Sequence, residues 1–305
     1  MNRLVRVEEE SVSKVLDGKR VVVTGASRGL GRAFARTLAA EGAQVVINAT
    51  GAEGLEETAG LIAEAGGRCE SVLGSVADEK VAAELVERCV SSFGGIDALV
   101  NNAGVNRDRT LMKMSGEEFD EVVAVNLRGT WACTKHAALA MKASGGTIVN
   151  VTSNSGLTGS VGQTNYAAAK AGVVGLTFTW AQELSRYGIR CNAIWPLALT
   201  QMTEPVYARR KQQAEEAGDP VPAATDAGFG DPDDVARVVA FLVSDAAREI
   251  NGQLISFNGR KLALWSHPRE INIERRDAWT LDELVRDFGK TAGSSLEEMY
   301  RASPT

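Results

Sequence analysis

The feature that most constrains the fold is an alternation, between residues 20 and 259, of short apolar runs and longer helical stretches. The short runs are rich in Val and Ile and end at Gly or polar residues, as strands buried on both faces do. They cover residues 21–23, 45–47, 68–73, 96–100, 147–151, 189–194 and 254–257. Between them, Leu30, Phe34 and Leu38 form an apolar helix stripe. Repeated β-α-β units predict an α/β fold: a Rossmann-like, doubly wound parallel sheet of about seven strands with helices on both faces.

The pattern indicates one domain over residues 18–260, with an N-terminal extension, 1–17, and a C-terminal extension, 261–305. The latter contains Thr280-Leu281-Asp282-Glu283, a capping box that predicts a short helix. Its apolar residues are too few for a separate core. We therefore expect it to pack on the main body or on a partner subunit.

Residues 203–230 interrupt the alternation with a polar stretch rich in Ala, Pro and Gly. A connection this long between sheet elements is usually functional, which predicts a substrate lid. The alternative is a disordered surface insertion. The basic run Arg209-Arg210-Lys211 could meet a carrier or coenzyme phosphate, or it could be a solvated helix face.

Composition excludes several classes of protein. Hydrophobic residues make up 44% and charged residues 24% of the 305, which is ordinary for a globular chain. The net charge of −6 argues against nucleic-acid binding. No apolar run approaches the roughly 18 residues of a membrane span, and the N-terminus lacks the apolar segment of a signal peptide. We expect a cytoplasmic protein that does not bind membranes.

The numbers and spacing of the cysteines and histidines argue against two further kinds of site. The four cysteines, Cys69, Cys89, Cys133 and Cys191, are widely spaced, which argues against a metal site and favours buried thiols in a reducing compartment. With two histidines and no Gly-x-Ser-x-Gly elbow, a Ser-His-Asp hydrolase is not indicated.

A glycine-rich turn follows the first predicted strand, in the sequence TGASRGLG at residues 24–31. Gly25, Gly29 and Gly31 allow a tight turn and let backbone N–H groups approach a phosphate at a helix N-terminus. The spacing is GxxxGxG, and no Gly-Lys-Ser/Thr of a Walker loop follows. The turn predicts a dinucleotide site.

A second group of residues suggests acid–base chemistry. Tyr166 and Lys170 lie on one helix face, and Ser153 stands 13 residues before Tyr166, just after a predicted strand. A phenol with a pKa of about 10 needs a shift of roughly three units to act near pH 7. A cation within about 4–6 Å supplies one to three units. By itself Tyr-x-x-x-Lys is common, and the alternative is a solvated helix face.

Together these residues resemble the short-chain dehydrogenase/reductase family over residues 18–260. The matches are TGASRGLG at 24–31, NNAG at 101–104, Asn126 in VNLRGT, Ser153 in VTSNSG and YAAAK at 166–170. The resemblance implies that Tyr166 is the general acid/base and that Ser153 holds the substrate carbonyl. It also implies that Lys170 binds the nicotinamide ribose and lowers the Tyr166 pKa, while Asn126 holds a water of the proton relay.

The resemblance also implies a cofactor site, with Asn102, Ala103 and Gly104 lining its adenosine side and supporting the central sheet. The implied cofactor-binding residues are Gly25, Ser27, Arg28, Gly29, Leu30, Gly31, Asn48, Thr50, Ser75, Val76, Asn102, Ala103, Gly104, Tyr166, Lys170, Pro196 and Leu199.

Two subgroups of the family are similar to this chain. NYAAAKAG at 165–172 resembles bacterial 3-oxoacyl-ACP reductases. Ser75-Val76-Ala77-Asp78, the GQTNY at 162–166, Pro196 followed by Met202-Thr203, and the tail after Gly259 resemble the (3R)-hydroxyacyl-CoA dehydrogenase domain of peroxisomal multifunctional enzymes. The family's usual Pro-Gly is here Pro196-Leu197, as also occurs in that subgroup. This leaves open the backbone contact to the nicotinamide carboxamide expected near Leu199.

The cofactor is predicted to be NADP(H). NAD-specific enzymes place a carboxylate at the end of the second strand, and the peroxisomal-like relatives have Asp where Ala49 stands. Here the strand ends Asn48-Ala49-Thr50, while Arg28 offers a guanidinium fork to a 2′-phosphate and Asn48 and Thr50 offer hydrogen bonds. The alternative is NAD(H) bound through Asn48, with Arg28 a solvated turn residue.

The predicted function is an NADPH-dependent ketoreductase that reduces a 3-oxoacyl thioester on CoA or acyl carrier protein, or a polyketide-type or steroid ketone, to a secondary alcohol. One alternative is an NAD-dependent (3R)-hydroxyacyl-CoA dehydrogenase working in the oxidative direction. Another is a non-catalytic dinucleotide-binding scaffold, against which the presence of Asn126, Ser153, Tyr166 and Lys170 argues. An acyl-CoA hydratase has no motif here.

A homodimer or homotetramer is expected. The stretches 129–143 and 165–182 carry apolar residues on more than one face. In the family that the chain resembles, these two helices pair across a two-fold axis. Deleting residues 261–305 is expected to weaken assembly or solubility while leaving the catalytic residues in place.

Overall fold

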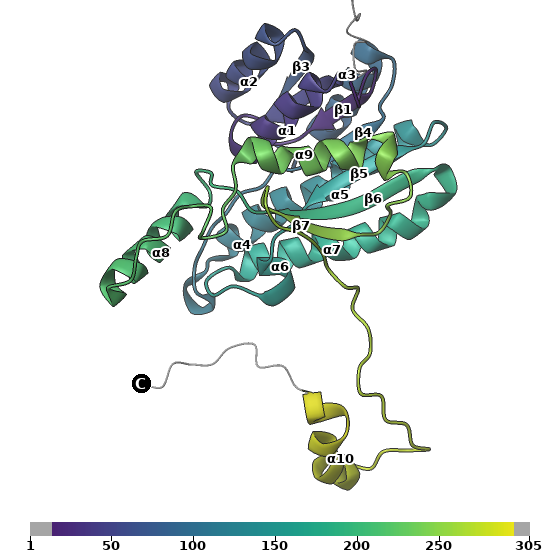
Figure 1. Ribbon diagram of the computed structural model, residues 1–305. Helices are drawn as coiled ribbons and strands as arrows, with labels where there is room; N and C mark the ends of the chain where they lie inside the picture. The colour runs from purple at the N-terminus through teal and green to yellow at the C-terminus, as the bar shows by residue number, and fades with distance from the viewer. Residues whose placement is uncertain (1–13, 296–305) are drawn as a thin grey trace, which may run out of the picture. The chain divides into compact units, whose positions relative to one another are not determined.

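The computed structural model describes residues 14–295, which form two compact units. The first unit ends at Leu264 and the second begins at Trp265 (Figure 1). The acidic run Glu8-Glu9-Glu10 and the N-terminus considered for a signal peptide lie outside the described residues.

The first unit is built on one eight-stranded sheet with the strand order β3-β2-β1-β4-β5-β6-β7-β8. All neighbouring strands are parallel except β8, which runs antiparallel to β7. This confirms the predicted doubly wound sheet and adds one short strand, which lies in the predicted C-terminal extension. The strands are β1 (Arg20–Val23), β2 (Gln44–Ala49), β3 (Arg68–Leu73), β4 (Ala98–Asn101), β5 (Gly146–Val151), β6 (Ile189–Pro196), β7 (Leu254–Phe257) and β8 (Leu262–Leu264).

Helices connect the strands and cover both faces of the sheet. They are α1 (Gly29–Ala40), α2 (Ala52–Glu64), α3 (Glu79–Phe93), α4 (Gly116–Val123), α5 (Gly129–Met141), α6 (Ser155–Thr158), α7 (Thr164–Glu183), α8 (Glu204–Ala217) and α9 (Pro232–Val243). One π-helical turn, η2 (Ala124–Arg128), lies between α4 and α5. No helix within residues 14–295 has the length and hydropathy needed to cross a membrane.

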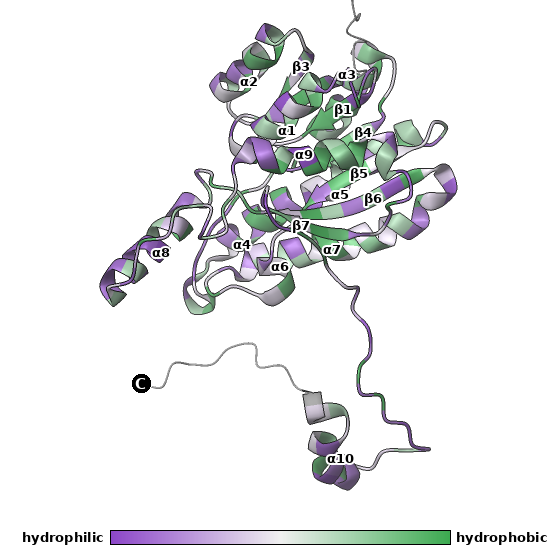
Figure 2. Cartoon of the chain, in the orientation of Figure 1, coloured by the Kyte–Doolittle hydropathy of each residue, from purple (hydrophilic) through white to green (hydrophobic). Residues whose placement is uncertain are grey.

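The alternation of side chains along each strand produces two cores. Val21 and Val23 of β1 join a cluster on one face with Phe34 of α1. Val22 points to the other face and packs in a cluster with Leu85 of α3. Because successive strand residues face opposite ways, a continuous apolar run buries both sides of the sheet. Figure 2 shows the hydrophobic residues concentrated in the strands and hydrophilic residues along α8.

The described end of the expected N-terminal extension contacts the body through Leu16. Leu16 is fully buried in the same cluster as Phe34, and its N–H donates to the Glu41 carbonyl at 2.9 Å. Leu16, which lies within the expected extension, therefore packs against the body.

The predicted lid, 203–230, is ordered around α8. The Tyr207 hydroxyl donates to the Pro222 carbonyl at 2.9 Å, and the Tyr207 ring meets buried Phe229 edge-on at 5.8 Å between centroids. The Arg210 guanidinium lies 5.2 Å from the Phe229 ring centroid. Arg210 is nevertheless exposed, as are most residues of α8, so the solvated helix face remains open for the basic run.

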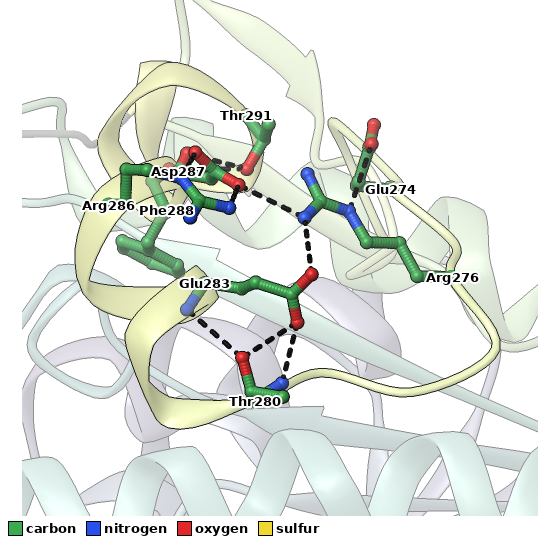
Figure 3. Close-up of polar contacts among 8 residues, drawn as sticks. All are labelled: Glu274, Arg276, Thr280, Glu283, Arg286, Asp287, Phe288 and Thr291. Atoms are coloured by element: carbon green, nitrogen blue, oxygen red, sulfur yellow. Dashed lines mark hydrogen bonds and ion pairs between the residues drawn. The ribbon is translucent and has the colours of Figure 1, made fainter.

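The second unit contains the predicted helix, α10 (Leu281–Asp287), and both bonds of its capping box between Thr280 and Glu283 are present. Figure 3 shows Arg276 reaching three carboxylates, Glu274, Glu283 and Asp287. Hydrogen bonds from Arg286 and Arg276 lower the pKa of Asp287 to about 2. Leu281 and Val285 remain exposed. A small unit held by polar contacts agrees with the expectation that it lacks a core of its own.

All four cysteines are free thiols. Cys89, Cys133 and Cys191 are buried and Cys69 is partly buried. Burial raises the pKa of each thiol to about 12, so they are protonated and unreactive near neutral pH.

Candidate active site

The strand order reverses between β1 and β4, and the predicted site residues collect at the carboxyl ends of the strands around this point. Gly25 follows β1, Asn102 follows β4, Ser153 follows β5 and Pro196 ends β6. In open α/β sheets the crevice at such a reversal is where ligands bind. The topology therefore brings together motifs that lie far apart in the sequence.

The glycine turn between β1 and α1 has the geometry of a phosphate cradle. Gly25 and Gly29 have φ angles of +67° and +55°, which favour glycine. A Cβ on Gly31 would lie 2.1 Å from the Gly25 carbonyl oxygen, so no side chain fits there. No side-chain cap occupies the N-terminus of α1, whose first N–H groups are left for an anion. These residues fit the pyrophosphate of a dinucleotide.

Asn102 and Thr24 lock this turn to the central sheet. The Thr24 hydroxyl accepts from the N–H groups of Asn102 and Ala103, both at 3.0 Å. The Asn102 amide donates to the carbonyls of Thr24 and Gly25, again at 3.0 Å. At Gly104 a Cβ would lie 2.9 Å from the side-chain oxygen of Asn126. The supporting role implied for this segment agrees with these contacts.

The end of β2 differs from the expectation at one residue. Asn48 is 1% exposed, and its amide donates to the carbonyls of Val72 and Gly74 at 3.1 and 2.9 Å. Both of its N–H donors thus tie β2 to the end of β3 and are not available to a ribose or phosphate. Thr50, two residues later, is exposed.

Ser75 and Val76 lie just after β3. The Ser75 hydroxyl accepts from the N–H of Ala77 at 3.3 Å. Val76 is 3% exposed, and a Cβ on Gly129 would lie 2.6 Å from its side chain. Close packing against α5 therefore fixes the position of this segment at the carboxyl edge of the sheet.

Two arginines flank the glycine turn. Arg28 is exposed, and its guanidinium donates to the Gln201 side-chain oxygen at 2.9 Å, next to the lid. Arg32, which sequence reasoning did not identify, pairs with Glu57 at 2.6 Å and donates to the Ser27 carbonyl. Arg32 stands four residues after Arg28, the N-cap residue of α1, and this spacing in the sequence is the signal that could have revealed it.

Helix α7 places Tyr166 and Lys170 one turn apart beside Ser153. The Lys170 Nζ lies 5.6 Å from the Tyr166 ring centroid, and Ser153 hydrogen-bonds to the Tyr166 phenol. Lys170 is 3% exposed, and its Nζ donates to the Val151 carbonyl at 2.8 Å. The structure thus brings the three residues together, as the spacing predicted.

Burial dominates the electrostatics of this group. It raises the pKa of Tyr166 to about 12; the Ser153 hydrogen bond lowers this pKa and the Asp108 carboxylate raises it. Burial also lowers the pKa of Lys170 to about 8. The expected lowering of the Tyr166 pKa by Lys170 is not seen here, because the ammonium is directed at the Val151 carbonyl and both groups are desolvated.

Asn126 lies in the π-helical turn η2 and is fully buried. Its side-chain oxygen accepts from the Val105 N–H at 2.8 Å, and its amide donates to the Val105 carbonyl at 2.9 Å. The side chain therefore holds the loop after β4. The backbone oxygen of Asn126 accepts from the Thr130 hydroxyl at 2.9 Å, so the π-turn holds both the side chain and the carbonyl of this residue.

Three further residues at this site were missed by sequence reasoning. The Ser155 hydroxyl donates to the Gln163 side-chain oxygen at 2.7 Å, and the Gln163 amide donates to Asp108 at 3.0 Å. Ser155 also contacts Ser153. Gln163 stands three residues before Tyr166, but only the folded loops bring Asp108 to it.

The segment after β6 settles the expectation at Leu199. Its N–H donates to the Gly230 carbonyl at 2.9 Å, and the Leu197 N–H donates to the Phe257 carbonyl at 3.0 Å. The Leu199 N–H is therefore committed to the fold rather than open toward a carboxamide.

Comparison with known proteins gives consistent matches. A family profile described as enoyl-(acyl carrier protein) reductase matches residues 25–259. Hydroxyacyl-CoA dehydrogenase ChsB1 of Mycobacterium tuberculosis is 40% identical over 310 residues, covering 94% of this chain and 93% of its own length. The 3-oxoacyl-[acyl-carrier-protein] reductase FabG of Thermotoga maritima is 40% identical over 249 residues, covering 80% of this chain and 98% of the relative.

Solved structures agree with these relatives. A short chain dehydrogenase from Mycobacterium avium has a TM-score of 0.77 at 38% identity and covers 93% of this chain and 97% of its own. A putative short-chain alcohol dehydrogenase from Sinorhizobium meliloti has a TM-score of 0.71 at 35% identity, covering 80% and 96%. With the fold, the glycine turn and the Ser-Tyr-Lys group in place, the chain belongs to the short-chain dehydrogenase/reductase family of oxidoreductases, whose members bind NAD(P).

Proposed function

We propose that this protein is an NADPH-dependent ketoreductase that reduces a 3-oxoacyl thioester to the corresponding secondary alcohol. The observation that carries the proposal is the convergence of Ser153, Tyr166 and Lys170 beside the glycine cradle at the switch point of the sheet. The bound cofactor would supply the hydride to the carbonyl carbon.

The chain's own residues handle the carbonyl oxygen and the proton. The hydroxyls of Ser153 and Tyr166 both donate to that oxygen, and Tyr166 then transfers its proton. A Tyr166 pKa of about 12 keeps the phenol protonated at neutral pH, which is the form that reduction requires. Lys170 would hold the ribose hydroxyls of the cofactor. Asn126, whose carbonyl accepts from Thr130 and keeps a second lone pair, would hold a water of the proton relay.

The preference for NADPH rests on charge at the end of β2. A carboxylate there would oppose the 2′-phosphate by about 4 kcal/mol per charge pair at about 4 Å in an effective dielectric of about 20. This chain has Asn48, Ala49 and Thr50 instead, with exposed Arg28 within the glycine turn. Because the Asn48 donors are used within the fold, Arg28 and Thr50 are the groups proposed to hold the phosphate.

Coenzyme A is the carrier to test first. The match to the relative named hydroxyacyl-CoA dehydrogenase covers 94% of this chain. It therefore includes part of the second unit, which begins at Trp265. The relatives named acyl-carrier-protein reductases cover about four-fifths of it. The name of this relative supports the second candidate, oxidation of a hydroxyacyl-CoA, for which the resemblance implies the (3R) configuration and NAD.

The test is steady-state turnover with acetoacetyl-CoA, a carrier mimic, a bulky cyclic ketone and crotonyl-CoA, each with NADPH and NADH. We expect acetoacetyl-CoA and NADPH to give the highest kcat/KM. Arg28→Ala should lower kcat/KM for NADPH but not for NADH, and Ala49→Asp should reverse the preference. Preference for NADH in the wild type contradicts the cofactor assignment. If the protein reduces crotonyl-CoA, an enoyl thioester, but reduces no ketone, the proposed ketone reduction is wrong.

A further inference from the structure

Two backbone carbonyls of the glycine turn accept hydrogen bonds from side chains of the neighbouring helices. The Thr58 hydroxyl, fully buried on α2, donates its one proton to the Ala26 carbonyl at 2.9 Å and shares it with the Gly54 carbonyl at 3.0 Å. The Arg32 guanidinium, on α1, donates to the Ser27 carbonyl. Both carbonyls are therefore held on the side of the turn that meets α2.

The two donors are themselves fixed by further contacts. The Arg32 Nε donates to the Thr58 hydroxyl at 3.0 Å, and its two terminal nitrogens donate to the two Glu57 oxygens at 2.7 and 2.6 Å. This bidentate pair sets the plane of the guanidinium and balances its charge. A Cβ on Gly54 would lie 3.0 Å from the Ser27 carbonyl oxygen, so the first turn of α2 touches the glycine turn directly.

The direction of these carbonyls decides where the next N–H groups point. In a trans peptide the carbonyl of one residue and the N–H of the next point in opposite directions. The Ser27 and Arg28 N–H groups therefore point away from α2, and neither has an acceptor within residues 14–295. Gly25 and Gly29, on either side, restrain the backbone little by themselves. The orientation of the two peptide planes thus depends on the bonds to their carbonyls.

We propose that Arg32 and Thr58 are positioning residues that keep the Ser27 and Arg28 N–H groups directed at the bound dinucleotide. The proposal rests on the proposed function, because it concerns how the glycine turn meets the cofactor. Both residues act on the turn and not on the 2′-phosphate. Their loss therefore weakens the binding of NADPH and NADH alike, whereas loss of the Arg28 side chain weakens the binding of NADPH alone.

The experiment measures the Kd of NADPH and of NADH by cofactor fluorescence, with a thermal melt for each variant. Arg32→Ala should raise both Kd values about tenfold, the upper range for one net hydrogen bond. In acetoacetyl-CoA reduction, the KM for NADPH should rise by a larger factor than kcat falls. Arg36→Ala is the matched control. It removes an arginine one turn further along α1 that pairs with Asp233 at 3.4 Å, and it should bind both dinucleotides as wild type does.

Two substitutions at Thr58 separate its hydrogen bond from its volume. Thr58→Val keeps the volume and removes the hydroxyl, so the Ala26 carbonyl loses its donor and both dinucleotides should bind more weakly. Thr58→Ser keeps the hydroxyl and should retain the wild-type affinity for both. A residue that only filled space would give the reverse order, with valine close to wild type and serine impaired.

Three results would overturn the positioning role while leaving the ketoreductase proposal intact. The first is a loss confined to NADPH in Arg32→Ala, because Arg32 would then contact the 2′-phosphate itself. The second is an equal loss in Arg36→Ala. The third is wild-type affinity in both Arg32→Ala and Thr58→Val. A wild-type chain that binds neither dinucleotide overturns the proposed function itself.

Discussion

At the residue scale, Lys170 is the most unusual titratable group of the site. Its ammonium is buried and donates to the Val151 carbonyl, the one acceptor it has among residues 14–295, so desolvation is little compensated. This lowers its pKa from 10.5 to about 8. The positive charge of Lys170, which is proposed to hold the cofactor ribose, is therefore lost as the pH rises through about 8.

This gives a pH dependence for cofactor binding. Below pH 8 Lys170 is charged and offers three donors; above it the neutral amine binds more weakly, so the NADPH Kd should rise between pH 7.5 and 9.5. A lysine with an ordinary pKa would show this change only above about pH 10. Lys170→Met should weaken binding at pH 7 and flatten the profile. Titration of cofactor fluorescence measures both, and a wild-type Kd constant across this range contradicts the assignment.

The grouping of Ser153, Tyr166 and Lys170 could be predicted from the sequence. Their spacing places Ser153 after a strand and the other two one turn apart on a helix. What could not be predicted depends on tertiary contacts. The commitment of the Asn48 amide to Val72 and Gly74 and of the Leu199 N–H to Gly230 is set by neighbouring strands and loops. The pKa of Tyr166 likewise depends on burial, which spacing does not reveal.

At the element scale, the glycine turn can be tested by a matched pair of substitutions. Gly31→Ala places a Cβ 2.1 Å from the Gly25 carbonyl, so the turn must move; NADPH binding should be lost and the melting temperature lowered. Gly60→Ala, in the exposed middle of α2, meets nothing within 4 Å and should stabilise the fold by about 0.5–1 kcal/mol. Retained NADPH affinity in Gly31→Ala would show that the turn does not bind the cofactor.

The elements themselves followed from the period of the apolar residues, and seven of the eight strands were expected where they occur. The eighth, β8, has three residues and is itself the edge strand, paired with β7 alone, so its own sequence carries little signal. The π-helical turn that contains Asn126 could not be predicted from the sequence either. Its two bonds to Val105 join segments 21 residues apart.

At the scale of the whole molecule, the two units are expected to differ in what they contribute. The first has cores on both faces of its sheet, whereas the second is a short helix with ion pairs around Arg276. Apolar residues such as Trp131 and Leu139 remain exposed on α5, one of the two helices predicted to pair between subunits. We therefore predict a homodimer or homotetramer, with the second unit assisting assembly or solubility.

Truncation and light scattering test this prediction. Removing residues 265–305 leaves β8 on the sheet, whereas removing 261–305 also strips β8 from β7 and should destabilise the body. The full chain should be a dimer or tetramer, and the shorter truncation should weaken assembly or solubility while conserving the catalytic residues. Trp131→Glu should dissociate the assembly, and Val15→Glu, at another exposed apolar residue, should not. A monomeric wild type at micromolar concentration contradicts the predicted pairing.

The central claim is that the Tyr166 hydroxyl delivers the proton in ketone reduction, and comparing Tyr166→Phe with wild type tests it most directly. Phenylalanine keeps the ring beside Lys170 and removes only the hydroxyl that Ser153 contacts. We predict that kcat for acetoacetyl-CoA reduction falls by about 10²–10⁴-fold, the usual contribution of a general acid. The NADPH Kd and the melting temperature should stay close to wild type. A Tyr166→Phe enzyme that turns over at the wild-type rate would contradict the account.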